Sequence, residues 1–164
     1  MKRLLMALVV AGLLGALSAP AAMATTTRIP TIATTGSSEI RNPGTWWYTG
    51  SGDQVEHVRG MVMLEMKNWN SPYALGPAYN TINWDLNLST GRGAIWGSAV
   101  HYPTAFPGSE WHCSFRMPFD GAGGYSGKGV CQGTGELAGW QWRVDLAVAP
   151  WGSTASGYIF KPGH

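Results

Sequence analysis

The sequence predicts an all-β fold, and three observations carry this prediction. After the N-terminal segment no stretch keeps the 3.6-residue hydrophobic period of a helix, and Gly, Pro or Asn recurs every few residues. Several segments alternate apolar and polar side chains, as half-buried antiparallel strands do. About eight strands joined mainly by hairpins, with an aromatic-rich face, favour a small up-and-down barrel. A β-sandwich is the alternative that these patterns leave open.

The first 24 residues predict a secretory signal peptide. Lys2 and Arg3 precede an apolar run from Leu4 to Leu17, and Ala22-Met23-Ala24 has the small-x-small cleavage pattern. The run is shorter than the roughly 20 apolar residues that a membrane-spanning helix needs. We therefore expect cleavage after Ala24, a secreted or periplasmic protein, and no integral membrane anchor.

The charge balance narrows the range of partners. Cleavage removes Lys2 and Arg3, two of the eleven basic residues, and leaves nine basic against nine acidic residues. A chain of about zero net charge, with no basic stripe, predicts binding neither to nucleic acid nor to an anionic membrane surface. The nine Trp, six Tyr and four Phe all follow residue 45, and such a composition is typical of a folded domain.

The expected organisation is one domain. Residues 25–43 are rich in Thr and Ser with two prolines and predict a flexible or extended lead-in. Residues 44–164 form the predicted single barrel domain, in which 68–80 and 101–109 are long connections. The expected strands cover 45–51, 56–67, 81–88, 94–100, 111–118, 124–133, 135–148 and 156–161.

Alternation predicts which side chains share a face. In 56–67 the shared face would hold Val58, Gly60, Val62, Leu64 and Met66. In 135–148 it would hold Ala138, Trp140, Trp142, Val144, Leu146 and Val148, with a bend or bulge at Gly139. A turn centred on Gly91 would pair Trp84 with Ser98, Leu86 with Trp96 and Ile82 with Val100.

The next hairpin predicts a disulfide. A turn centred on Ala122 places Cys113 opposite Cys131, and two cysteines in an exported chain typically form a bridge. Neither cysteine has zinc-site spacing, so we expect no metal and no cofactor. The same register sets large side chains over glycines, in the pairs Trp111–Gly133, Phe115–Gly129 and Met117–Gly127.

Short glycine motifs carry a resemblance to a known family. Gly91-Arg92-Gly93-Ala94-Ile95-Trp96-Gly97 and the stretch from Gly127-Lys128-Gly129 to Gly133-Thr134-Gly135-Glu136-Leu137-Ala138-Gly139 resemble the allene-oxide-cyclase/dirigent type of calycin barrel. The resemblance spans about residues 44–160. It implies an eight-stranded barrel with an apolar cavity that binds or cyclises a hydrophobic substrate. It transfers no catalytic residue to this chain.

The sequence contains no recognisable catalytic motif, so the catalytic residues remain unknown. A His–carboxylate pair of His101 with Glu65 or Asp85 could perform acid–base chemistry. Arg59 or Arg143 paired with a carboxylate of Glu65, Asp85 or Glu136 could lie inside the barrel. The candidate ligand-binding residues are loop, mouth and face positions: Trp69, Tyr73, Trp84, Trp96, His101, Tyr102, Trp140 and Trp142.

Three functions follow from these patterns. The first is an exported barrel that binds a small hydrophobic ligand, or is purely structural. The second is a barrel isomerase or cyclase, which needs only a shaped cavity and one or two polar groups. The third is a carbohydrate-binding module that uses exposed loop aromatics, with a glycan as partner.

Overall fold

The computed structural model describes residues 27–52, 54–149 and 152–162, and the predicted signal segment lies outside them. The described chain forms one antiparallel sheet of nine strands with a single 3₁₀ turn, so the predicted all-β class is confirmed. The strands are β1 (Arg28–Asn42), β2 (Thr45–Thr49), β3 (Val55–Trp69), β4 (Gly76–Asn87), β5 (Arg92–His101), β6 (Trp111–Asp120), β7 (Tyr125–Gly133), β8 (Gln141–Ala149) and β9 (Gly152–Phe160), and the 3₁₀ turn is η2 (Gly135–Leu137).

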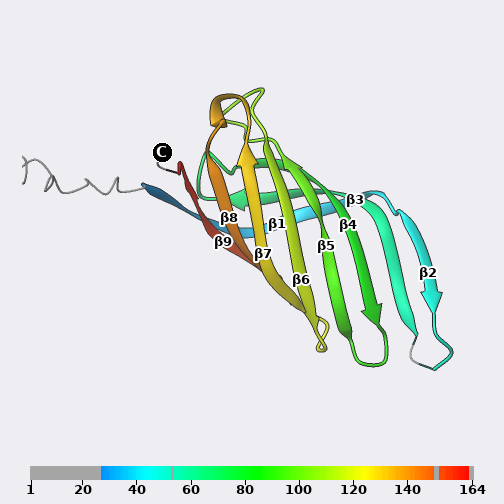
Figure 1. The fold of residues 1–164 in the computed structure, drawn as a ribbon. Helices are drawn as coiled ribbons and strands as arrows, with labels where there is room; N and C mark the ends of the chain where they lie inside the picture. The colour runs from blue at the N-terminus through cyan, green and yellow to red at the C-terminus, as the bar shows by residue number, and fades with distance from the viewer. Residues whose placement is uncertain (1–26, 53, 150–151, 163–164) are drawn as a thin grey trace, which may run out of the picture.

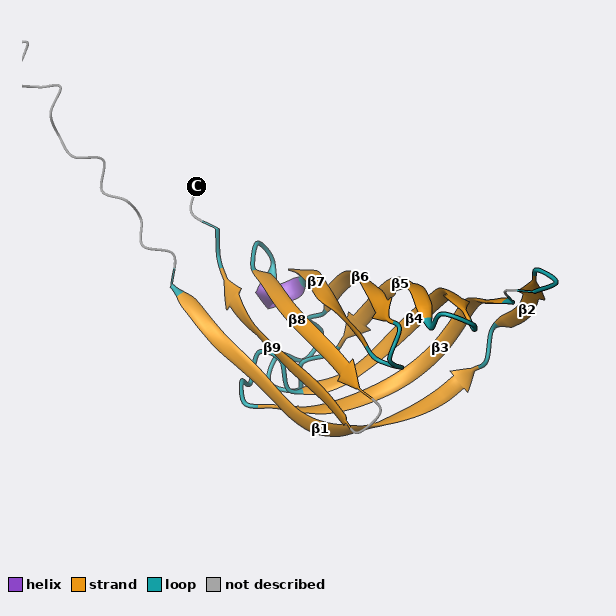
Figure 2. Ribbon diagram, turned by 90° about the horizontal axis from the view of Figure 1, so that it is seen from below, coloured by secondary structure: helices purple, strands orange, loops and turns teal. Residues whose placement is uncertain are grey.

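The sheet closes on itself through β1. This strand pairs with β9 along Arg28–Ala33 and with β3 along Ala33–Asn42, so β1 and β3–β9 form an eight-membered ring. Figure 2 shows β1 as a long curved strand beneath the others, with β2 continuing from its end. The residues expected to be a lead-in outside the sheet thus contain the strand that closes it.

The two ends of the barrel differ. Tight hairpin turns lie at one end, and the longer loops 70–75, 102–110 and 134–140 gather at the other (Figure 1). The loops pack through rings: Tyr73 stacks on Phe106 with 4.8 Å between centroids, and its centroid lies 5.7 Å from that of Trp140. Trp111 is fully buried beneath them and donates its indole N–H to the Tyr73 carbonyl at 2.7 Å. These loops cap the barrel at that end.

Two clusters of buried side chains fill the ring. Below the loop cap lie Ala33, Trp69, Ala74, Trp111, Cys131, Leu137, Trp142, Val144, Ala155 and Ile159. Toward the hairpin turns lie Val58, Met61, Ile82, Ile95 and Met117.

The β6–β7 hairpin has the predicted register. Cys113 pairs with Cys131 and the two form a disulfide, while Trp111 lies opposite Gly133 and Phe115 opposite Gly129. A Cβ atom placed on Gly127 would lie 2.7 Å from the Met117 side chain. Met117 therefore packs over Gly127, as the third predicted pair requires.

The β4–β5 register differs from the prediction. Trp84 pairs with Ile95, Leu86 with Gly93 and Ile82 with Gly97, a shift of three residues that moves Trp96 to the opposite face from Trp84. The reason is the turn: the Asn87 side-chain oxygen accepts hydrogen bonds from the N–H groups of Ser89 and Thr90. This Asx turn starts the loop at Asn87 and centres it before Gly91.

Strand β3 carries a bulge that the sequence pattern did not show. Val58 pairs with Trp84 and Met61 pairs with Ile82. Two residues of β3, Arg59 and Gly60, therefore lie opposite the single residue Asn83 of β4. Gly60 adopts a φ of 68°, a left-handed conformation that favours glycine. After the bulge the inward face consists of the odd-numbered residues. The prediction that Val58 shares a face with Val62, Leu64 and Met66 is therefore wrong. The inward positions beyond the bulge are Met61, Met63, Glu65, Lys67 and Trp69.

The predicted strand over 135–148 is broken. Residues Gly135–Leu137 form η2, and β8 begins only at Gln141. Gly135 and Gly139 have φ values of 60° and 81°, which turn the backbone out of the sheet on both sides of Leu137. Leu137 is consequently buried. Trp142 and Val144 share a face of β8 as predicted, and in the structure that face points inward.

Candidate functional site

A cavity lies inside the ring where the two core clusters meet. Its apolar wall comes from β6, β7 and β8 and contains Phe115, Trp142, Val144, Leu146 and the Cys113–Cys131 disulfide. The cavity offers about 70 Å³ to the centres of water-sized molecules and is partly open to solvent. At roughly 10–15 Å³ per water, this space corresponds to about five water positions, or to one small ring.

The opposite wall of the cavity is polar and comes from β3, β4 and β5. Glu65 and Lys67 line it because the Arg59–Gly60 bulge turned the odd-numbered side of β3 inward. Asn80 and His101 line it from β4 and β5, where Asn80 pairs with Ala99 and Ala78 with His101. Asn80 and His101 are thus diagonal neighbours on one face of the sheet. The cavity therefore has one apolar and one polar side.

The two charged residues of the polar wall neutralise each other. Lys67 Nζ forms an ion pair with Glu65 Oε1, and the side chains are 12% and 24% exposed. An ion pair with so little exposure is retained where both charges stay partnered. The Glu65 charge also reaches Tyr125, whose pKa is raised mainly by burial and further by this carboxylate.

His101 and Asn80 both line the cavity, and each has one buried side-chain nitrogen without a hydrogen-bond partner in the described part of the chain. His101 is 4% exposed and Asn80 is 8% exposed, and neither His101 Nε2 nor Asn80 Nδ2 has a hydrogen-bond partner among the described residues. Burial lowers the pKa of His101 to about 4, although a hydrogen bond to the Ala74 backbone opposes this shift. The imidazole is therefore neutral near pH 7. Its ring packs edge-on against Trp142 with 5.4 Å between centroids.

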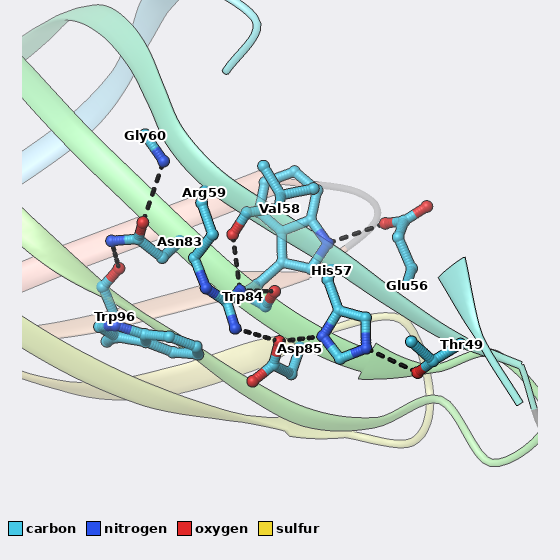
Figure 3. A network of polar contacts seen from close by, with 10 residues as sticks. All are labelled: Thr49, Glu56, His57, Val58, Arg59, Gly60, Asn83, Trp84, Asp85 and Trp96. Atoms are coloured by element: carbon cyan, nitrogen blue, oxygen red, sulfur yellow. Dashed lines mark hydrogen bonds and ion pairs between the residues drawn. The ribbon is translucent and has the colours of Figure 1, made fainter. Parts of the chain in front are cut away.

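A second polar group lies around the bulge on β3 (Figure 3), and much of it satisfies the backbone there. Arg59 Nη1 donates to the carbonyls of Val58 and Trp84, both at 2.8 Å. The Asn83 side-chain oxygen accepts from the Gly60 N–H at 2.9 Å. Because a bulge interrupts the ladder, these side chains replace the missing strand-to-strand hydrogen bonds. This group fixes the bulge, and the bulge in turn sets Glu65 and Lys67 inside the barrel.

The same group contains a hydroxyl–imidazole–carboxylate chain on the outer face. Thr49 Oγ1 lies 2.8 Å from His57 Nε2, and His57 Nδ1 lies 2.6 Å from Asp85 Oδ1. The order resembles that of a nucleophile, a base and an orienting carboxylate. However, the same Asp85 oxygen is bound by Arg59 at 2.7 Å, and the Trp47 ring stacks on His57 with 5.0 Å between centroids. Burial would raise the pKa of Asp85, but hydrogen bonds from Arg59 and His57 outweigh it and lower the pKa. We interpret the chain as a clamp that joins β2, β3 and β4.

The predicted ligand-binding residues separate into four places. Trp69, His101 and Trp142 line the cavity, and Trp69 belongs to the end of β3 rather than to a loop. Tyr73 and Trp140 lie in the loop cap, and Trp84 packs against the core cluster near the hairpin turns. Trp96 lies on the outer face between Arg59 and Arg116, and Tyr102 is exposed beside Tyr79.

Of the predicted charge pairs, Arg59–Asp85 forms, whereas the pairing of His101 with Glu65 or Asp85 does not. Glu65 pairs with Lys67, and Asp85 pairs with His57 and Arg59, so neither carboxylate forms an ion pair with His101. The Arg59–Asp85 pair does form, but on the outer face of the sheet rather than inside the barrel. Arg143 is exposed on the outer face as well.

Sequence reasoning missed Lys67 and Asn80, and it considered Glu65 without placing it. Asn80 lies in the part of β4 that was expected to be a loop, so its alternation with Ala78 and Ile82 was not considered. Lys67 was not considered, because a continuous alternation puts it on the opposite face from Val58 and the bulge alone turns it inward. The one available signal was Gly60 in the middle of the strand, since an isolated strand glycine often marks a bulge.

Comparisons with known proteins leave the family open. No protein-family model matches this chain, and neither the comparison with curated proteins nor that with solved structures finds a match. Within the described ranges, no three His, Cys, Asp or Glu side chains converge as metal ligands would. The described part of the chain also contains no helix with the length and hydropathy to cross a membrane. The function is therefore inferred from the geometry of the cavity.

Proposed function

We propose that this protein is an exported barrel that binds a small, mainly apolar molecule in the cavity between its two core clusters. One observation carries the proposal: two buried polar atoms, Asn80 Nδ2 and His101 Nε2, lack protein partners in the wall of the same cavity. A buried polar group without a hydrogen bond costs about 1–3 kcal/mol. A ligand with complementary polar atoms would recover that cost.

The composition of the walls supports the same function. Binding pockets for small molecules are typically lined by apolar and aromatic side chains with a few polar groups that fix orientation. Here Trp69, Phe115 and Trp142 supply the aromatic surface, and the polar groups gather on β3–β5. The disulfide across β6 and β7 is consistent with an oxidising, extracytoplasmic location.

A barrel isomerase or cyclase is the second candidate, favoured by the presence of His101, Glu65 and Lys67 in one cavity. An effective general base has a pKa near the working pH. Because the pKa of His101 is lowered to about 4, its ring serves better as a hydrogen-bond acceptor than as a base at neutral pH. Binding is therefore the better supported function of this cavity.

A carbohydrate-binding surface has less support. Trp69 is buried, which removes it from the loop platform that a sugar would stack on. Trp46 and Trp47 are 44% and 39% exposed on β2, but adjacent strand residues point to opposite faces. Trp46 packs edge-on against Trp84 and Trp47 stacks on His57, so the two rings form no common platform.

Native mass spectrometry of the protein, exported through its own signal, tests the proposal. We expect an adduct of small mass that survives gentle ionisation and is lost on unfolding. A variant with Ala99→Phe should block the cavity, because Ala99 lines it, and should carry no adduct. An adduct that stays on this variant would place the ligand elsewhere. A ligand that returns from the protein chemically altered would favour the cyclase.

A further inference from the structure

We infer that the ligand is an uncharged molecule of about one ring that carries a hydroxyl group, and that this hydroxyl bridges Asn80 and His101. The inference rests on the proposed cavity function and assigns the chemical class of its ligand. It follows from three properties of the cavity: the two unpartnered atoms, the internal ion pair and the space between the walls.

The first property is the pair of hydrogen-bonding atoms. Asn80 Nδ2 carries N–H groups and can only donate. A neutral imidazole has one N–H and one acceptor nitrogen, and its N–H meets the Ala74 backbone. Because Nε2 has no protein partner, the geometry assigns the proton to Nδ1 and leaves Nε2 as the acceptor. A hydroxyl oxygen accepts from Asn80 while its proton is donated to His101, so one group satisfies both atoms.

The second property is the charge of the polar wall. Glu65 and Lys67 are paired with each other, so their charges sum to zero in the cavity. A carboxylate ligand would have to displace Glu65 from Lys67, and an ammonium ligand would have to displace Lys67 from Glu65. Either exchange leaves a largely buried charge without its partner, which is costly. The cavity therefore selects an uncharged ligand.

The third property is the size and shape of the space. About 70 Å³ is available to the centres of water-sized molecules and the cavity is partly open, so one six-membered ring is the largest group that we expect it to hold, and a long chain or a fused ring system is too large. The ring would lie against Phe115, Trp142 and Val144, and its hydroxyl would point to the β4–β5 side. Phenol combines these features and serves as the probe.

The test compares four probes of similar size on the full chain: phenol, anisole, toluene and benzoate. Their dissociation constants are measured by titration of tryptophan fluorescence, since Trp69 and Trp142 line the cavity. Anisole keeps the acceptor oxygen and lacks the proton, toluene lacks both, and benzoate adds a charge. We expect phenol to bind at least about tenfold more tightly than each of the others, because each leaves a buried polar group unpaired or adds a charge.

The outcomes distinguish failure of the hydroxyl inference from failure of the proposed binding function. If toluene or anisole binds as tightly as phenol, the cavity binds apolar molecules and the hydroxyl inference is wrong. If benzoate binds most tightly, the inference of an uncharged ligand is wrong. If none of the four binds, both the hydroxyl inference and the proposed function for a ligand of this size are overturned.

Variants test the two contacts separately. His101→Phe should lower phenol affinity about tenfold and leave toluene affinity unchanged, because it removes the acceptor and keeps an aromatic ring. Asn80→Leu should have a similar effect through loss of the donor, and it serves alone if His101→Phe does not fold. His112→Phe is the matched control, since His112 is exposed on the outer face and contacts Glu110. Equal phenol affinity in Asn80→Leu and the unchanged protein would refute the bridge.

Discussion

Two asparagines on β4 face opposite sides of the sheet, and their replacement by leucine should change stability in opposite directions. Asn80 points into the cavity with its Nδ2 unpartnered. Asn83 points outward, accepts from the Gly60 N–H at 2.9 Å and donates more weakly to the Trp96 carbonyl at 3.4 Å. The substitution and the strand are the same, whereas the face of the sheet and the hydrogen bonding differ.

The expected magnitudes follow from these contacts. Asn80→Leu removes an unsatisfied buried donor, and the adjacent cavity has room for the larger side chain, so we expect a gain of about 1 kcal/mol. Asn83→Leu removes one good hydrogen bond and one weak one and leaves the Gly60 N–H unpaired, so we expect a loss of about 1 kcal/mol. The two variants should differ by about 2 kcal/mol in the free energy of unfolding.

Urea unfolding of the disulfide-bonded protein, followed by tryptophan fluorescence, measures the difference. With a urea slope of about 2 kcal/mol per molar, the two midpoints should lie about 1 M apart, with Asn80→Leu the higher. Equal midpoints, or a lower midpoint for Asn80→Leu, would refute the reasoning that the cavity holds an unsatisfied donor. A stabilised variant with weakened phenol binding would show that the site is maintained at a cost in stability.

Three further predictions concern the scaffold. Burial lowers the pKa of His101 from 6.5 to about 4. Between these pH values the unfolded chain binds a proton at His101 that the folded chain does not bind. The free energy of unfolding should therefore be highest above about pH 6.5 and fall by up to about 3 kcal/mol toward pH 4. Urea midpoints across this range check it, and a matching fall in His101→Phe would contradict it. Replacing Cys113 and Cys131 with Ala should lower the free energy of unfolding by about 3 kcal/mol, because their bridge closes a loop with a sequence separation of 18. An unchanged midpoint in the same urea assay would contradict this prediction. Gly60→Ala should cost about 1 kcal/mol through its left-handed backbone alone, since a Cβ atom there meets nothing within 4 Å; a thermal midpoint equal to that of the unchanged protein would show that the bulge relaxes.

The sequence alone determined the class of fold and its best-defined hairpin. Strict alternation and frequent glycines predict strands, because a strand with one buried face repeats every two residues. The β6–β7 register followed from a single assumption, since Cys113 opposite Cys131 also aligned Phe115 with Gly129. Local information was sufficient there because the turn and both strands lie within about 25 residues of sequence.

The polar wall of the cavity was decided by the tertiary structure. A one-residue change of parity moves every following side chain to the other face, and the change at Gly60 reversed the side on which Glu65 and Lys67 lie. The bulge is held by Arg59 and Asn83 through hydrogen bonds to strand neighbours that the sequence does not reveal.

Closure of the ring was also decided by contacts between distant segments. Residues Arg28–Asn42 look like a linker because their Thr, Ser and Pro content carries no hydrophobic period, yet they fill the gap between β9 and β3. Backbone hydrogen bonds to two partner strands hold β1 in place, and its buried Thr31 and Ala33 side chains add contacts with the core. Local side-chain patterns thus specified most of the strands, whereas backbone pairing and one bulge specified the closing strand and which side chains meet inside the barrel.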